Sequence, residues 1–245
     1  MEFPAVYVLH VKEGYEDRAR HIEKTMSRLG LEFEYILDGD MSDLTSECLD
    51  RYFTGDMHAV TPATSCGMKH ILAYERIVAG NLPGALILED DMFLSPKFPA
   101  LVMRTVAQAR EFSAGEPVWI GYEASGLKFI PRSRRKKGIH IYRMDELQCA
   151  GAYYINRECA RLLLNLTSEN KCPVVFDWYV TRLCRQTGFH LYWAHPVLAE
   201  QGSHTGRMQS SIGNGVSDGS AWGQRWARIK RPLTTLYKRL VSFFR

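Results

Sequence analysis

Three consecutive carboxylates, Glu89, Asp90 and Asp91, directly follow the apolar residues 85–88. The apolar run is typical of a buried strand, and unpaired charge is costly to bury, so we expect the acids to face a cleft. Alternate side chains of an extended segment point the same way, which groups Glu89 with Asp91 and turns Asp90 to the other side. Clustered carboxylates bind hard divalent cations, which in turn bind phosphate. The triplet therefore predicts a metal-assisted phosphosugar or nucleotide site; the alternative is an acidic turn at a strand end.

A further acid, Asp177, stands alone in the apolar and aromatic stretch 174–178. Such surroundings raise the pKa of a carboxyl group, and a raised pKa suits a general base. Asp177 is therefore the candidate base, with an N-cap or first-turn residue of the following helix as the alternative. Among the histidines, His204 in the glycine-containing loop 202–206 is the candidate partner of Glu89 and Asp91 as a metal ligand, because imidazole binds manganese together with carboxylates.

Two basic residues near the N-terminus, Lys12 and Arg18, follow the first apolar run. Arg18 lies at the front of an expected helix, where backbone N–H groups and a cation together attract phosphate. We expect both side chains to contact phosphate groups of a ligand; for Lys12, a solvated surface position is an equally good interpretation.

The elements that position these residues follow from periodicity. Residues 3–11 and 31–37 have the composition of strands, and residues 17–29 between them carry apolar side chains at helical spacing. This βαβ unit is the building block of parallel sheets, in which ligands bind beyond the carboxyl ends of the strands. No GxGxxG motif follows the first strand, which argues against a dinucleotide cofactor. Later segments alternate in the same way, so we expect an α/β fold with a mostly parallel, Rossmann-like sheet in one domain over residues 1–212.

The composition is that of an ordinary globular protein, with 46% hydrophobic and 24% charged residues among 245. The six cysteines form no CxxC pair, which favours reduced core thiols and a cytoplasmic location. The start of the sequence lacks the features of a signal peptide, and no segment approaches the roughly 20 apolar residues that span a bilayer.

The C-terminal part of the sequence, residues 213–245, reads as a Gly/Ser linker followed by a basic amphipathic segment. Residues 221–245 mix tryptophan, leucine and phenylalanine with arginine and lysine, a pattern suited to an anionic membrane surface. The alternative is a helix packed on the domain with a basic outer face.

Several motifs in combination resemble glycosyltransferase family 25, the lipooligosaccharide galactosyltransferase-like group. The likeness covers about residues 3–212 and rests on these segments: Tyr7-Val8-Leu9 with Arg18, Asp38-Gly39-Asp40, Ser65-Cys66-Gly67-Met68-Lys69-His70, Ile87-Leu88-Glu89-Asp90-Asp91, Gly151-Ala152-Tyr153-Tyr154-Ile155 and residues 173–177. Two positions depart from the family pattern: Lys69 replaces the usual serine, and His10-Val11 replaces the usual Asn-Leu pair.

The resemblance implies a GT-A type fold and transfer of a sugar, typically galactose from UDP-galactose, to a saccharide acceptor with inversion at the anomeric carbon. It implies a divalent cation, Mn²⁺ or Mg²⁺, at Asp91, Glu89 and His204, and a base at Asp177. The residues that it implies for donor binding are Lys12, Arg18, Asp38, Gly39, His70, Glu89, Asp90, Gly151 and Ala152.

We therefore expect a cytoplasmic, inverting glycosyltransferase that acts on lipooligosaccharide or another saccharide or glycolipid, peripheral on the inner face of the cytoplasmic membrane. One alternative is a non-catalytic saccharide- or nucleic-acid-binding protein. The acid triplet argues against it, as does the lack of interleaved aromatic and basic residues along one strand, and we expect no nucleic-acid partner. The other alternative is a nucleotide-sugar hydrolase that uses the same acids.

Overall fold

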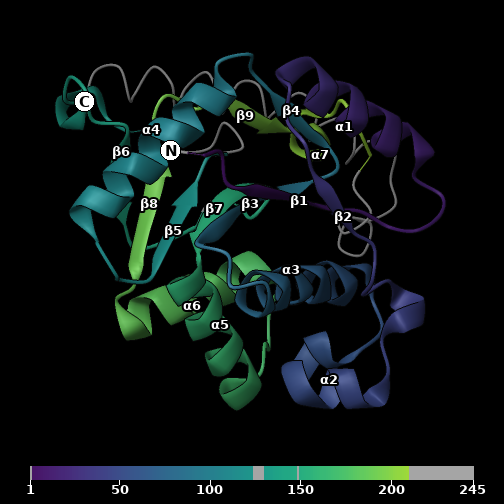
Figure 1. Ribbon diagram of the computed structural model, residues 1–245. Coiled ribbons are helices and arrows are strands. Elements are labelled where there is room, and N and C mark those ends of the chain that lie inside the picture. Colours follow the sequence, from purple (N-terminus) through teal and green to yellow (C-terminus); the bar gives the residue numbers. More distant parts are fainter. Residues whose placement is uncertain (1, 124–129, 148, 210–245) are drawn as a thin grey trace, which may run out of the picture.

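A computed structural model describes residues 2–123, 130–147 and 149–209 (Figure 1). Its central sheet has seven strands in the order β2-β1-β3-β7-β5-β8-β6, and β4 pairs with β9 in a separate two-stranded sheet. The strands are β1 (Ala5–Leu9), β2 (Glu34–Ile36), β3 (Gly84–Glu89), β4 (Met92–Leu94), β5 (Val118–Gly121), β6 (Ile141–Met144), β7 (Ala152–Asn156), β8 (His190–Ala194) and β9 (Ala199–Gln201).

Seven α-helices connect the strands within the described ranges: α1 (Glu16–Leu29), α2 (Ser46–Tyr52), α3 (Pro62–Ala79), α4 (Phe98–Phe112), α5 (Arg157–Asn170), α6 (Phe176–Thr187) and α7 (Gly202–Thr205). Local sequence sets several helix ends. The Thr61 side chain accepts a hydrogen bond from the Thr64 N–H at the start of α3, and Gly30 ends α1 in the left-handed conformation that glycine tolerates.

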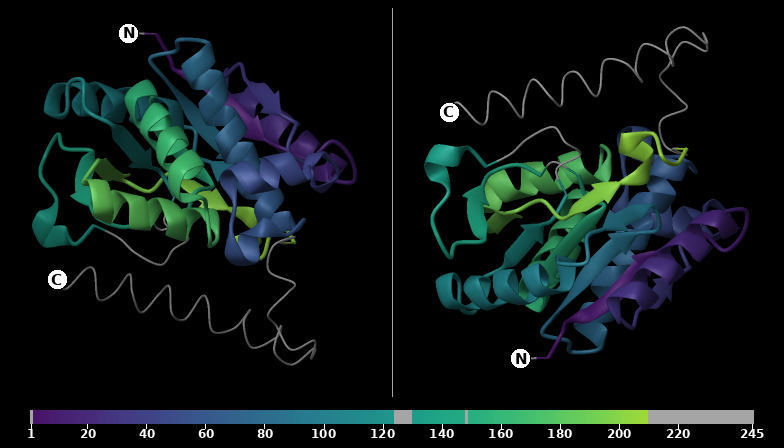
Figure 2. Two further views of the ribbon diagram at one scale, coloured as in Figure 1. Left: turned by 90° about the horizontal axis from the view of Figure 1, so that it is seen from below. Right: turned by 90° about the horizontal axis from the view of Figure 1, so that it is seen from above.

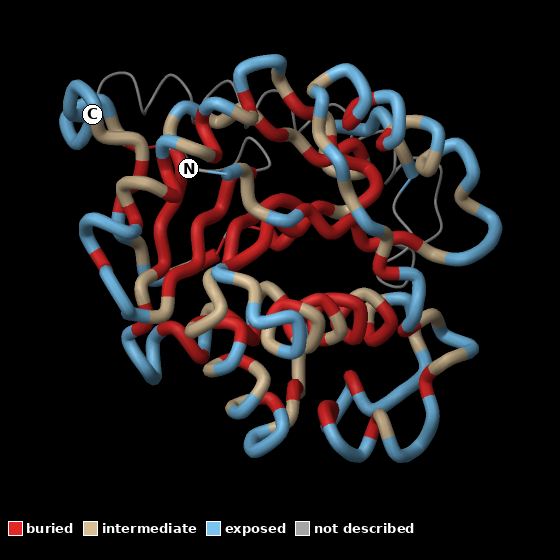
Figure 3. The backbone as a smooth tube through the Cα atoms, viewed as in Figure 1, coloured by how far each residue is buried: buried red, intermediate tan, exposed pale blue. Residues whose placement is uncertain are grey.

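Two apolar layers flank the sheet and hold it between helices (Figures 1 and 2). Tyr7 and Ile87 belong to the layer under α3, α5 and α6, whereas Val8 and Leu88 belong to the layer under α1 and α4. This alternation is the period of two expected for strands buried on both faces. The buried backbone accordingly runs through the middle of the molecule (Figure 3).

The carboxyl ends of β1, β2 and β3 lie level with one another. Leu9 pairs with Ile36 on one side and with Glu89 on the other, and both pairings are parallel. The loops that follow these strands therefore meet at one edge of the sheet, which is the place where open α/β sheets bind ligands.

The predicted α/β class with a mostly parallel sheet is confirmed, because β1, β2, β3, β5 and β8 share a direction. The sequence did not reveal that β7 and β6 run antiparallel to their neighbours, nor that β4 pairs with β9. Strand direction and such remote pairings depend on contacts far apart along the chain, which local periodicity does not report. The predicted boundary at residues 212 and 213 and the predicted C-terminal segment lie outside the described residues.

Candidate functional site

The acid triplet lies at the carboxyl end of β3, as its sequence position predicts. Glu89 is the last residue of the strand, and Asp90 and Asp91 form the turn into β4. The end of β9 and the start of α7 fold over this turn. Gln201 donates its side-chain N–H to Glu89 Oε2 at 2.7 Å, and the Ser203 backbone N–H donates to Asp91 Oδ2 at 3.0 Å. One segment of the chain therefore positions two of the three carboxylates.

The Asp90 carboxylate turns away from that segment and is held by the Arg18 guanidinium and the His10 imidazole. Its Oδ1 accepts a hydrogen bond from Arg18 Nη1 at 2.8 Å, and its Oδ2 lies 2.6 Å from His10 Nδ1. The side chains of all three residues are at least 86% buried. Asp90 and Arg18 were both predicted to bind the donor, and the structure places them in a buried ion pair with each other.

The Glu89 carboxylate, in contrast, has no cationic side chain at hydrogen-bond distance among the described residues and lies near other acids. Its pKa is raised well above the usual value, mainly by burial and further by the negative charges of Asp91 and Glu123. Glu123 follows the carboxyl end of β5 and is 5% exposed. The side chains of Glu123 and Met92 pack closely against Gly151. A Cβ at position 151 would lie 2.7 Å from Glu123 Oε2 and 2.9 Å from Met92 Sδ, so this packing requires glycine.

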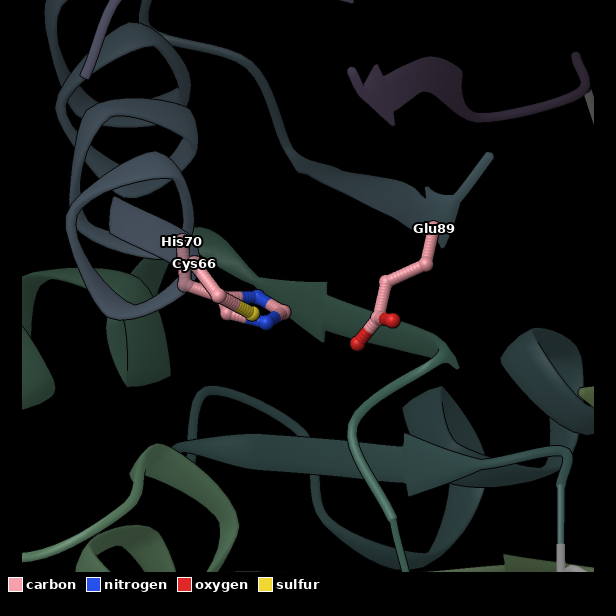
Figure 4. A group of neighbouring side chains, drawn as sticks. All are labelled: Cys66, His70 and Glu89. Atoms are coloured by element: carbon pink, nitrogen blue, oxygen red, sulfur yellow. The ribbon is translucent and has the colours of Figure 1, made fainter. Parts of the chain in front are cut away.

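His70 lies beside Glu89 on α3 and is fully buried. Its Nδ1 is 2.7 Å from the Tyr153 hydroxyl, and its ring stacks on Phe176 with a centroid distance of 4.4 Å. Burial lowers the pKa of His70 to about 3, so its imidazole is neutral at physiological pH. Figure 4 shows His70 and Cys66 side by side on the helix, both turned toward the Glu89 carboxylate.

Asp177 occupies the first turn of α6, whereas the N-cap is Val175. Its Oδ1 accepts a hydrogen bond from the Trp178 backbone N–H at 2.8 Å. Burial raises the pKa of Asp177. Of two nearby groups, His204 lowers this pKa and Glu123 raises it. The first-turn alternative therefore describes its place in the helix, while the charges that act on Asp177 place it near the acid cluster.

His204 in α7 lies next to Glu123 and Cys149. Its Nδ1 is 3.4 Å from Glu123 Oε1 and 3.7 Å from Cys149 Sγ. Within the described ranges, two groups of side chains hold possible metal-ligand atoms within 4.8 Å of one another: Cys66 with His70 and Glu89, and Glu123 with Cys149 and His204. The three predicted metal ligands do not form one of these groups. Glu89 and Asp91 lie at the end of β3 and in the turn after it, whereas His204 belongs to the second group.

The loop after β2 brings further predicted donor residues to the same edge. Lys12 Nζ lies 2.7 Å from Asp43 Oδ2 and 3.7 Å from Asp38 Oδ1, and the Asp38 side chain is 69% exposed. Gly39 adopts a positive φ of 89°, and its carbonyl accepts a hydrogen bond from the Ser65 hydroxyl.

Both departures from the family pattern contact acids at this edge. Lys69 Nζ lies 2.8 Å from Asp40 Oδ1 and also donates to two backbone carbonyls after β2. His10, the other departure, is the partner of Asp90 described above. Lys69 and His10 therefore each hold a loop in place at the carboxyl edge of the sheet.

Gly151 and Ala152 are at the start of β7, between β3 and β5. The Gly151 carbonyl accepts the Glu89 N–H at 2.8 Å, and the Ala152 carbonyl accepts the Tyr122 N–H at 2.9 Å. These two residues join the carboxyl ends of β3 and β5 through backbone hydrogen bonds.

Sequence reasoning missed Glu123 and the ligand-type thiols of Cys66 and Cys149. Glu123 comes just after the apolar strand 118–121, the same pattern that singled out the triplet, but as a single acid it gave a weaker signal. The cysteines have no spacing motif, and only the fold brings them to carboxylates and histidines.

The structure also contains a cavity of about 680 Å³ between α1 and the β4–β9 pair. His21, Arg28, Phe93 and Leu198 are among its lining residues, and none of the predicted site residues lines it. The chemistry of the carboxylates, rather than cavity size, locates the candidate site at the carboxyl edge of the sheet.

Comparison with known families gives the class of the protein. A family model described as "Glycosyltransferase family 25 (LPS biosynthesis protein)" matches residues 3–178, well over half of the chain, so the protein is a glycosyltransferase. It belongs to glycosyltransferase family 25, as the sequence motifs predicted. The mostly parallel α/β sheet is consistent with the GT-A type.

Solved structures with distant similarity include three proteins. A glycosyltransferase involved in glycosylation of the major capsid of PBCV-1 has 11% identity and a TM-score of 0.40, covering 97% of this chain and 100% of that one. Mouse xyloside xylosyltransferase 1 has 11% identity and a TM-score of 0.35, covering 76% and 77%. A putative glucose-1-phosphate thymidylyltransferase from Bacillus anthracis has 13% identity and a TM-score of 0.34, covering 92% and 75%. A comparison with curated proteins gave no match.

Across the described residues, none of the helices combines the length and apolar character needed to cross a membrane.

Proposed function

We propose that this glycosyltransferase transfers galactose from UDP-galactose to a lipooligosaccharide or another saccharide acceptor, with inversion at the anomeric carbon. The observation that carries the proposal is the gathering of Glu89, Asp91 and Glu123 at the carboxyl edge of the sheet, with Asp177 close enough to sense the charge of Glu123. A set of acids around one edge suits a donor whose diphosphate is held through a cation, with a separate base for the acceptor.

The residues present fit a divalent cation of the oxygen-binding class. Asp91 Oδ1 is buried and has no hydrogen-bond partner within the described part of the chain, so this lone pair is available to a cation. We assign Asp91 and Glu89, with His204 as the third ligand, to Mn²⁺ or Mg²⁺. When bound, the cation would neutralise the departing diphosphate.

The chain itself supplies the proton transfer. Asp177 accepts the proton of the acceptor hydroxyl as that oxygen attacks the anomeric carbon, and the raised pKa makes its carboxylate a stronger base. The neighbouring Trp178 is 66% exposed, which supports a role in stacking on a sugar of the acceptor. Tyr179, the other aromatic residue beside Asp177, is 4% exposed and packs in the core.

The test is a screen of UDP-sugars with Mn²⁺ or Mg²⁺ and oligosaccharide acceptors, with released UDP as the readout. We expect UDP release from UDP-galactose that depends on the acceptor. Release at the same rate without acceptor would identify the hydrolase alternative, and no release from any donor would support the binding-protein alternative.

Asp91→Ala tests the cation assignment. We expect the variant to lose metal-dependent binding of UDP, measured by calorimetry, because the loss removes a ligand whose second oxygen is already held by Ser203. Glu200→Ala is a matched control, because Glu200 lies nearby in β9 and pairs with Arg207. Unchanged affinity and metal response in Asp91→Ala would contradict the assignment.

The sequence of residues 221–245 supports peripheral attachment to an anionic membrane on its cytoplasmic face. Deletion of residues 223–245 should weaken sedimentation with anionic liposomes and leave transfer to a soluble acceptor unchanged. Equal sedimentation of the two proteins would instead favour the interpretation of a helix packed on the domain.

A further inference from the structure

The group of Cys66, His70 and Glu89 brings together three different ligand atoms. A thiol sulfur, an imidazole nitrogen and a carboxylate oxygen lie within 4.8 Å of one another, from α3 and the end of β3 (Figure 4). Cys66 and His70 are four residues apart and so lie on one face of the helix. Residues so spaced are positioned to bind one ion from the same side.

A second observation, on the His70 side chain, independently indicates that this group binds a ligand. Its side chain is fully buried, yet Nε2 has no hydrogen-bond partner among the residues that the structure describes. A buried polar nitrogen without a partner costs free energy, and a bound cation would remove that cost. Figure 4 shows the ring turned from α3 toward Glu89, and a ring nitrogen of His70 lies within 4.8 Å of the ligand atoms of Cys66 and Glu89.

The surroundings of His70 match those of a metal-binding histidine. Such a residue usually holds its other ring nitrogen in a hydrogen bond, which fixes the ring and its tautomer. Here Nδ1 is 2.7 Å from the Tyr153 hydroxyl, which is itself 2.9 Å from the Tyr74 hydroxyl. Stacking on Phe176 with an interplanar angle of 1° fixes the ring plane. If Nδ1 donates to Tyr153, the lone pair of Nε2 is left for a cation.

We propose that Cys66, His70 and Glu89 bind a divalent cation of the zinc class, at a site that shares Glu89 with the Mn²⁺ or Mg²⁺ set proposed above but has different other ligands. Thiolate and imidazole ligands favour Zn²⁺ over the hard cations Mg²⁺ and Mn²⁺. Three protein ligands leave the fourth position of a tetrahedral zinc ion open. Cys66 and Glu89 are half-buried, whereas His70 is fully buried.

Glu89 and His70 also belong to the proposed donor site, so the two proposals share residues. Zn²⁺ bound to Glu89 would compete with its use at the donor, and we expect Zn²⁺ to inhibit transfer supported by Mn²⁺. The proposed zinc site rests on the geometry of these three side chains and does not require the transferase assignment to hold.

The test uses Co²⁺ as a spectroscopic probe for Zn²⁺ in the full chain, without any sugar nucleotide. We expect one equivalent of Co²⁺ to give a near-ultraviolet sulfur-to-cobalt charge-transfer band, and Zn²⁺ to displace it. Cys66→Ser should abolish the band and lower the affinity for Zn²⁺ at least about tenfold, since removal of a ligand should cost no less than removal of a residue that only supports one.

Cys149→Ser is the matched control, because Cys149 belongs to the other group of candidate ligands. The band should survive in this variant, and both variants should retain the circular dichroism of the wild type. Absence of a thiolate band in the wild type, or its loss in Cys149→Ser with retention in Cys66→Ser, would overturn the proposal. UDP release measured separately in Cys66→Ser with Mn²⁺ should equal that of the wild type, so failure of the transferase assignment and failure of the zinc site give different results.

Discussion

Glu89 and Asp90 are consecutive residues with opposite electrostatic surroundings. The Asp90 carboxylate is held by Arg18 and His10, each at hydrogen-bond distance, on the side of the sheet covered by α1. The Glu89 carboxylate faces α3; burial raises its pKa, and the negative charges of Asp91 and Glu123 raise it further. One acid is neutralised by the chain, and its neighbour is not.

The difference suggests separate roles: Asp90 positions the turn, and Glu89 is available to bind a ligand. A fully paired, buried carboxylate fixes the turn that follows β3, because Arg18 ties α1 to it. A carboxylate among like charges destabilises the ligand-free protein. Such electrostatic repulsion is typical of sites that bind a ligand of opposite charge. The comparison predicts that changes on the Asp90 side affect stability, whereas changes on the Glu89 side affect function and cation response.

The largest effect is expected at Asp177, which belongs with the acids of the Glu89 side. Asp177→Asn removes the proposed base and should lower kcat by about 10²–10⁴-fold, while UDP binding is retained. The wild-type kcat should also fall at low pH, because protonation of Asp177 removes the base, and its raised pKa moves this loss toward neutral pH. Steady-state kinetics over a pH series measure both. A normal rate in Asp177→Asn would assign the proton transfer to another group.

On the Asp90 side, Asp90→Asn should cost about 3–5 kcal/mol of unfolding free energy, because the change leaves the Arg18 charge buried without its partner. Urea denaturation measures the loss. The matched control is Asp17→Asn, since Asp17 is paired with Arg20 on the surface, where such pairs contribute about 0–1 kcal/mol. Equal losses in the two variants would remove the distinction between the buried pair and an ordinary surface pair.

A smaller effect of opposite sign is expected at Glu89. Because its folded-state pKa is raised, the folded protein retains the proton longer than the unfolded chain does. Its contribution to stability is therefore present below the usual pKa of 4.5 and is lost as pH rises through the raised value.

Glu89→Gln removes the carboxylate whose ionisation destabilises the fold at neutral pH. With a chelator present at neutral pH, the variant should therefore have a higher melting temperature than the wild type, by about 2–4 °C for each kcal/mol of unfolding free energy gained. A divalent cation should stabilise the wild type more than the variant. A lower melting temperature for Glu89→Gln in the chelator would mean that the Gln201 hydrogen bond outweighs the charge repulsion.

The parts of this site that sequence predicts are those set by local pattern. The apolar run before Glu89 predicted β3, and strand alternation predicted that Asp90 turns away from Glu89. The partners of these acids were not predictable in the same way. His10, Glu123 and Gln201 reach them from the carboxyl ends of β1, β5 and β9, and a single polar residue carries no periodicity that would identify its partner. The roles of the predicted donor, metal and catalytic residues remain predictions.

The pairing of β4 with β9 determines when the site forms during folding. The match to the family model ends at residue 178, yet Gln201 and Ser203 complete the hydrogen bonds of Glu89 and Asp91. In addition, β8 lies inside the sheet between β5 and β6. Contacts across more than one hundred residues close late, because the entropy of a long loop must be lost first. A nascent chain that ends at residue 178 thus has its acids but not the segment that orients them, so residues 201–203 must be synthesised before the site can be assembled.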